Sequence, residues 1–258
     1  MAEPIDPPPA SRPIRTHLAD GLSLANGACG VAGILILLAW HDPRALTAAC
    51  ALVFVGWGFD SVDGLAARGV GRPRAVGEVM DSLCDVASFG VLPAILISVH
   101  SLQFDRPIAV VGGAIGVLFY ACVVLRLRRY TVHAVGEHVA PRLFFEGLPS
   151  PVAAMCVAST ILAARVRPGP LVWAPFVFAA ACASLMVSTI PFKDTPRLAT
   201  WLVRAIWPIP VLVAVGVAAG GATAVLVFFA AYLASGALRM HAPGVPSPPD
   251  PGHGPAPN

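Results

Sequence analysis

Long apolar runs separated by short polar segments extend along most of this 258-residue sequence. Each run is about 17–23 residues long, which as a helix is enough to cross about 30 Å of hydrocarbon. The pattern predicts an all-α, polytopic membrane helix bundle of about eight transmembrane helices, six in a core and two C-terminal to it. The predicted helices are 22–40, 45–67, 79–99, 107–125, 148–164, 170–190, 200–216 and 221–238.

Four aspartates interrupt this apolar pattern where the second and third runs meet. Asp60 and Asp63 are three residues apart, and Asp81 and Asp85 are four apart. Each pair therefore lies on one face of a predicted helix. Glycines and alanine continue these two faces, and a short basic loop at residues 69–76 joins them. The sequence thus predicts two small-residue helix faces that each carry two carboxylates.

Carboxylates in or beside a membrane are costly unless they pair, line a wet cavity or bind a cation. No matching set of lysines accompanies these four acids, which suggests that metal ions balance their charge. Ligation by oxygen alone favours Mg²⁺ or Mn²⁺ over zinc, and no His or Cys stands at ligand spacing. Two divalent ions together form a clamp for phosphoryl chemistry. Arg68 could donate two hydrogen bonds to a phosphate, beside small residues that leave room for a nucleotide.

The fixed residues of this stretch form a recognisable signature. It runs Asp60-x2-Asp63-Gly64-x2-Ala67-Arg68-x8-Gly77-x3-Asp81-x3-Asp85 and resembles the signature of the CDP-alcohol phosphatidyltransferases at all eight positions. Within that family the chain is most similar to the phosphatidylserine synthases. The similar stretches are Asp81–Gly90, Arg126–Tyr130, Gly147–Pro151 and Leu185–Ser188, although Arg128 and Thr131 stand where alanine and asparagine are usual.

The resemblance implies a reaction and a set of residue roles. The reaction would move the phosphatidyl group from CDP-diacylglycerol to L-serine, with two divalent ions, and would release phosphatidylserine and CMP. Asp60, Asp63 and Asp81 would hold the metals; Asp85 would approach one of them and act as the catalytic general base. The CDP cradle would comprise Asp63, Gly64, Ala67, Arg68 and Gly77. A homodimer is expected from the resemblance alone.

Four further polar residues lie at the predicted helix ends, and each has two interpretations. Asn26, near the start of the first run, could contact CDP or form an interhelical hydrogen bond. Arg126 and Arg129 share a helix face and could bind an acceptor carboxylate or an anionic head group, or only anchor the helix. Lys193 could bind the acceptor or a phosphate, or anchor its helix at the interface.

The basic residues predict how the helices are oriented. Only 12% of the residues are charged, whereas 57% are hydrophobic. If both termini lie in the cytoplasm, twelve basic residues fall on the cytoplasmic side and four fall on the other, a positive-inside bias. The aspartates then lie at the cytoplasmic face of an integral membrane protein, expected in the cell inner membrane. The net charge of +3 comes from these loops and gives no support for nucleic-acid binding.

The remaining segments complete the predicted organisation. Residues 1–20 are expected to be disordered or interfacial, with a short helix at 14–24 and no removable signal peptide. Residues 21–193 would form the catalytic membrane domain, residues 194–240 the additional helices, and residues 241–258 a Pro/Gly-rich disordered tail. The six cysteines are scattered singly through apolar runs and are predicted to be small buried hydrophobic residues.

Two alternative functions remain open. The same chemistry could use another acceptor, namely glycerol-3-phosphate, inositol phosphate or choline; the basic residues near Arg126 would suit a phosphorylated one. A small membrane transporter is the alternative from a different class. It would need its acids deep in the bilayer and usually a paired repeat, whereas these acids lie at one face and no repeat is evident.

Overall fold

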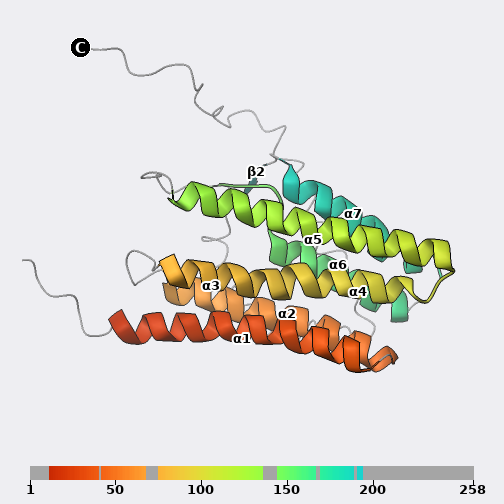
Figure 1. Cartoon of the computed structure of the whole chain (residues 1–258), viewed down its shortest axis with the longest axis horizontal. Helices are drawn as coiled ribbons and strands as arrows, with labels where there is room; N and C mark the ends of the chain where they lie inside the picture. Colours follow the sequence, from red (N-terminus) through yellow and green to blue (C-terminus); the bar gives the residue numbers. More distant parts are fainter. Residues whose placement is uncertain are drawn as a thin grey trace, which may run out of the picture.

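The computed structural model describes residues 12–40, 42–67, 75–135, 144–166, 169–188 and 191–193. They form a bundle in which α1 and α2 pack together on one side and α5 and α7 on the other (Figure 1). The long helices are α1 (Arg12–Ala39), α2 (Pro43–Ala67) and α5 (Arg106–Val135). The shorter ones are α3 (Ala75–Asp85), α4 (Leu92–Ser101), α6 (Ser150–Val166) and α7 (Ala174–Val187), with a π-helical turn η1 (Val86–Val91) and a 3₁₀ turn η2 (Pro170–Trp173).

Within the described part of the chain, four stretches are long and apolar enough to cross a membrane: Asp20–Ala39, Pro43–Val62, Val79–Ser101 and Arg106–Arg129. They coincide with the first four predicted helices. The fifth and sixth predictions correspond to α6 and α7, which are apolar but shorter. The polytopic helix bundle is therefore confirmed. The predicted helices at 200–216 and 221–238 lie outside the described residues, so the number of eight stays a prediction.

The N-terminal helix is longer than predicted. A separate interfacial helix was expected at 14–24, but α1 runs without a break from Arg12 to Ala39. Gly21 does not end it, because one glycine in a helix costs only about 1 kcal/mol relative to alanine. Residues 1–11 of the predicted N-terminal segment lie outside the described residues.

The third predicted helix contains a wide turn that the apolar pattern did not reveal. Between α3 and α4, the backbone N–H of Leu92 donates to the carbonyl of Ala87, five residues back, as in a π-helix. Pro93 follows at the start of α4. Proline cannot donate the usual bond to the carbonyl four residues back, so a wider turn before it is a natural accommodation. The turn begins directly after Asp85.

A two-stranded ribbon was also not predicted. β1 (Phe144–Glu146) pairs antiparallel with β2 (Pro191–Lys193), and Phe144 lies opposite Lys193. Gly147 follows β1 with a φ of +80°, and a Cβ there would lie 2.5 Å from the carbonyl oxygen of Met186. Only glycine fits this position without strain. The ribbon and this glycine hold the start of α6 against the end of α7.

The core lies where η1, α4 and α5 meet α2, α6 and α7. Its largest fully buried side chains include Phe89, Phe119, Leu96 and Ile161. All six cysteines are free and buried, which confirms their predicted role as small core residues.

Candidate functional site

Three of the four predicted metal-binding acids come together at one end of the bundle. Asp60 lies near the C-terminal end of α2, and Asp81 and Asp85 lie in α3. One carboxylate oxygen from each lies within 4.8 Å of the other two, and all three side chains are partly buried. The two acid-bearing helix faces therefore meet. The side chain of Asp63 is not among those the structure describes.

Helix α1 reaches this cluster through Asn26, which is fully buried. Its amide Nδ2 donates to Asp85 Oδ1 at 3.0 Å. Asn26 thus forms an interhelical hydrogen bond, and its partner is the predicted catalytic base. The hydroxyl of Ser88, also fully buried, donates to the backbone carbonyl of Asn26 at 2.7 Å.

The charges around Asp85 oppose one another. The carboxylates of Asp60 and Asp81 repel its negative charge, whereas the guanidinium of Arg126 attracts it. Three carboxylates this close are unfavourable when all are ionised, and a bound cation would offset the repulsion. Because every donor is a carboxylate oxygen, the set fits Mg²⁺ or Mn²⁺ better than a softer metal.

The two arginines of α5 differ in their surroundings. Arg126 is buried and its Nη1 donates to Ser150 Oγ at 3.0 Å, at the start of α6. Arg129 is exposed and its Nη1 donates to the carbonyl of Val187 at 2.8 Å, at the end of α7. A helix anchor at the membrane surface would not be buried, so burial near Asp85 favours a site role for Arg126. Arg129 instead ties α5 to α7.

Comparison with known proteins decides the family. The profile of the CDP-alcohol phosphatidyltransferase family matches residues 16–191. The chain belongs to this family. It is 40% identical over 147 residues to the archaetidylserine synthase of Methanothermobacter thermautotrophicus, an alignment that covers 56% of this chain and 58% of that protein.

Two further relatives carry the name CDP-diacylglycerol–serine O-phosphatidyltransferase. The protein from Mycobacterium leprae is 34% identical over 161 residues, covering 59% of this chain and 50% of its own. The protein from Bacillus subtilis is 29% identical over 139 residues, covering 53% of this chain and 70% of its own. The alignments thus span about half of the length of the first two relatives.

Three further signature positions of the CDP-alcohol phosphatidyltransferases lie on the two helices that carry the acids. Gly64 and Ala67 lie in the last turns of α2, and Gly77 lies in the first turn of α3. A Cβ on Gly77 would lie 3.5 Å from the Asp20 carboxylate of α1, an ordinary contact distance. Arg68 lies outside the described residues. Lys193 lies in β2, and the position of its side chain is not described.

Sequence reasoning missed two residues that bond to side chains or backbone of the candidate site. Ser88 and Ser150 were noted only as members of the family-like stretches Asp81–Gly90 and Gly147–Pro151. Both are fully buried hydroxyls that bind a residue already predicted for the site. The signal available was a serine within an apolar helix, and that signal is weak because serine is also common in helix packing.

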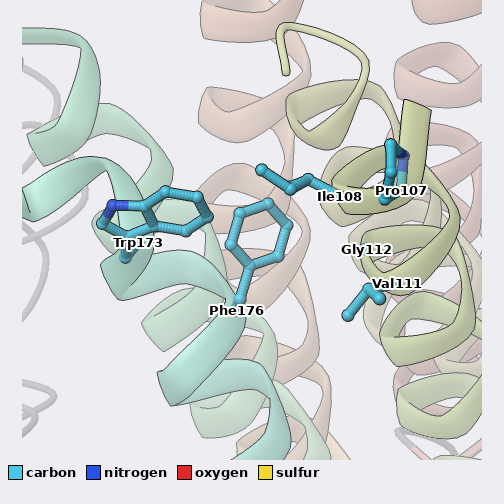
Figure 2. A pocket seen from close by; sticks show the side chains of 6 residues that line it. All are labelled: Pro107, Ile108, Val111, Gly112, Trp173 and Phe176. Atoms are coloured by element: carbon cyan, nitrogen blue, oxygen red, sulfur yellow. The ribbon is translucent and has the colours of Figure 1, made fainter. Parts of the chain in front are cut away.

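An apolar pocket of about 240 Å³ lies at the other end of α5 from Arg126 (Figure 2). It forms between the first turns of α5 and the junction of η2 with α7, where the Trp173 and Phe176 side chains face α5. No lining side chain offers a carboxylate, base or metal ligand. The pocket is therefore separate from the acid cluster. Its lining residues are Pro107, Ile108, Val111, Gly112, Trp173 and Phe176.

Proposed function

We propose that this membrane protein transfers the phosphatidyl group of CDP-diacylglycerol to L-serine, which yields phosphatidylserine and CMP. The convergence of Asp60, Asp81 and Asp85, all at signature positions of the family, carries the proposal. The names of the similar proteins from archaea and bacteria support serine as the acceptor.

The donor set suits two divalent ions, Mg²⁺ or Mn²⁺. Asp60, Asp63 and Asp81 would hold them, and Asp85 would approach one. When bound, such ions neutralise charge on a diphosphate and on the departing phosphate. Gly64, Ala67, Arg68 and Gly77 would form the CDP cradle, with the Arg68 guanidinium donating to the diphosphate.

The chain's own residues would then position the serine and remove its proton. The serine hydroxyl oxygen forms a bond to the β-phosphorus, the bond from that phosphorus to the bridging oxygen breaks, and CMP leaves with the electron pair. Asp85 accepts the hydroxyl proton. A serine hydroxyl is a poor nucleophile at neutral pH, so its placement beside a base contributes more than its intrinsic reactivity.

Arg126 is the candidate for binding the serine carboxylate. Its guanidinium is buried near Asp85, with Nη1 on Ser150 Oγ. A planar guanidinium can donate two hydrogen bonds to one carboxylate. Arg129 and Lys193 would contribute positive charge nearby. The same charges would suit a phosphorylated acceptor, so glycerol-3-phosphate and inositol phosphate are the main competitors, and choline is a third.

The test is a transfer assay with purified protein, CDP-diacylglycerol and one radiolabelled acceptor at a time. L-serine should give labelled phospholipid with CMP release, and Asp60→Ala should abolish it as a matched control. Product from glycerol-3-phosphate, inositol phosphate or choline instead would correct the acceptor. No labelled lipid with any acceptor would overturn the transferase itself.

The oligomeric state, the membrane location, the domain bounds and the substrate routes are part of the same proposal. The chain would act as a homodimer in the cell inner membrane, with its site open to the cytoplasm. Residues 21–193 would form the catalytic domain. CDP-diacylglycerol would enter from the bilayer, and serine and CMP would exchange with the cytoplasm.

A further inference from the structure

The strongest unexplained feature near the acid cluster is a pair of hydrogen bonds that links Ser88 to Asp85 through Asn26. Ser88 Oγ donates to the Asn26 backbone carbonyl at 2.7 Å, and Asn26 Nδ2 donates to Asp85 Oδ1 at 3.0 Å. Ser88 and Asn26 are both fully buried. Ser88 lies three residues after Asp85 in the sequence, yet both hydrogen bonds join this segment to Asn26 of α1.

The orientation of the Asn26 amide is fixed by its neighbours. A carboxylate accepts hydrogen bonds, so the NH₂ group must face Asp85. Its Oδ1 then faces α2, where a Cβ on Gly56 would lie 2.9 Å away. Among the described residues this buried oxygen has no hydrogen-bond partner. Burying an unpartnered acceptor is costly, so packing alone does not account for an asparagine here, whereas its bond to Asp85 does.

The π-helical turn η1 delivers Ser88 to α1. The turn begins directly after Asp85, and its extra residue changes the direction of the side chains that follow. Gly30 of α1 permits the close approach, because a Cβ there would lie 2.7 Å from the Ser88 backbone nitrogen. The local distortion that follows Asp85 therefore places the Ser88 hydroxyl, which bonds to Asn26, the partner of Asp85.

We propose that Asn26 and Ser88 are positioning residues for Asp85, with Ser88 acting through Asn26. The bond from Asn26 occupies one carboxylate oxygen of Asp85 and fixes the plane of the group. The second oxygen is then left to take the proton of the acceptor hydroxyl. The inference rests on the proposed function for the role of Asp85 and adds the residues that orient it.

A double-mutant cycle with Ser88→Ala and Asn26→Ala tests this order of action. In the wild-type background Ser88→Ala should lower kcat about tenfold, since small misplacements of a catalytic group are costly, with little change in KM for CDP-diacylglycerol. In the Asn26→Ala background the same change should have almost no further effect on kcat. The amide through which Ser88 acts is then already gone.

Thermal unfolding supplies a readout that separates positioning from stability. The Ser88 bond goes to a backbone carbonyl, which Asn26→Ala retains. Ser88→Ala should therefore lower Tm by about 2–4 °C in both backgrounds. Ser159→Ala is the matched control, because Ser159 is equally buried but, in the part of the chain that the structure describes, its hydroxyl bonds only the Met155 carbonyl of its own helix. It removes a buried hydroxyl without removing an interhelical bond, and it should leave kcat unchanged whatever its effect on Tm.

Rates are measured as CMP release with whichever acceptor gives the fastest wild-type rate. If serine is not the acceptor, kcat can then still be measured, so an error in the proposed acceptor is not mistaken for an error in the positioning role. The inference is overturned if Ser88→Ala keeps wild-type kcat, if its kcat effect is equally large in both backgrounds, or if Ser159→Ala loses as much activity. Wild-type protein without CMP release would instead overturn the proposed function.

Discussion

At the residue scale, Asp85 is the residue to which we assign both metal binding and base catalysis. It lies within reach of Asp60 and Asp81, and one of its oxygens already accepts from Asn26. Asp85→Asn keeps the volume and can still accept that bond, but it removes the basicity. Turnover should fall by about 10²-fold or more, while binding of a CDP-lipid changes much less. Both rate and CDP-lipid affinity must be measured.

A different result for Asp85→Asn would change the role that we assign to Asp85. If Asp85→Asn loses CDP-lipid binding as severely as rate, the residue acts as a ligand and the base lies elsewhere. Near-normal turnover would contradict the proposed mechanism at its centre.

Substitution of Arg68 tests the predicted contact between the signature and the CDP diphosphate. Arg68→Ala should weaken CDP-lipid binding, because a hydrogen bond to a charged group contributes about 1.5–3 kcal/mol. Arg128→Ala is the control, since Arg128 is an exposed arginine of α5 outside the signature. Titration of both variants with a CDP-lipid checks the expectation. Equal losses would mean that Arg68 contributes only general positive charge.

The sequence predicted the acids better than the residues that support them. The spacing of the aspartates, three and four residues, is enough to place each pair on one helix face. That Asn26 binds Asp85, and that Ser88 binds Asn26, depends on how α1 packs against η1. The periodicity of apolar residues in a single sequence does not show how α1 aligns against η1. The interhelical bond of Asn26 was one of two open interpretations, and its partner was not predicted.

At the element scale, the packing of α1 against η1 depends on missing side chains. A Cβ on Gly30 would lie 2.6–2.7 Å from the Oγ, Cα and N atoms of Ser88. Because two of these atoms are backbone, no side-chain rotation relieves the clash. Gly30→Ala should therefore destabilise the protein by about 1–3 kcal/mol, lower Tm, and reduce activity.

Gly21 offers the matched control on the same helix. A Cβ there meets nothing within 4 Å. Gly21→Ala should raise stability by up to about 1 kcal/mol, because alanine favours the helix. Thermal unfolding of the two variants side by side checks both signs. A Gly30→Ala variant as stable as Gly21→Ala would contradict the close packing of α1 on η1.

The π turn and the ribbon show what the apolar pattern leaves out. The apolar run predicts that residues 79–99 are helical, but a run that is apolar throughout gives no sign that the helix widens at 86–91. Pro93 was the available signal. The β1–β2 ribbon is three residues long on each side, too short to produce an alternating pattern.

At the scale of the whole molecule, a metal requirement is the broadest test of the acid cluster. Activity should vanish with EDTA and return when Mn²⁺ or Mg²⁺ is added in excess of the chelator. EDTA already saturated with Mg²⁺ is the control for effects of the chelator itself. Full turnover in metal-free EDTA would rule out the two-metal interpretation.

Orientation across the membrane decides which compartment supplies the acceptor. The basic residues divide twelve to four between the two predicted sides. The bundle is consistent with this division, because Arg126 lies near Asp85 whereas Arg106 begins α5 at its other end. If the basic loops lie on the cytoplasmic side, as we propose, the acid cluster and the loop at residues 69–76 would face the cytoplasm.

Single cysteines, introduced into a background that lacks the six native ones, test this arrangement. A cysteine at Gly71, in the loop 69–76, should react with an impermeant thiol reagent only from the cytoplasmic side. A cysteine at the exposed Asp105, between α4 and α5, should react only from the opposite side. If Gly71→Cys is labelled only from outside the cell, serine would have to reach the acids from that compartment. The cytoplasmic source of the acceptor, and the positive-inside argument on which it rests, would then both be wrong.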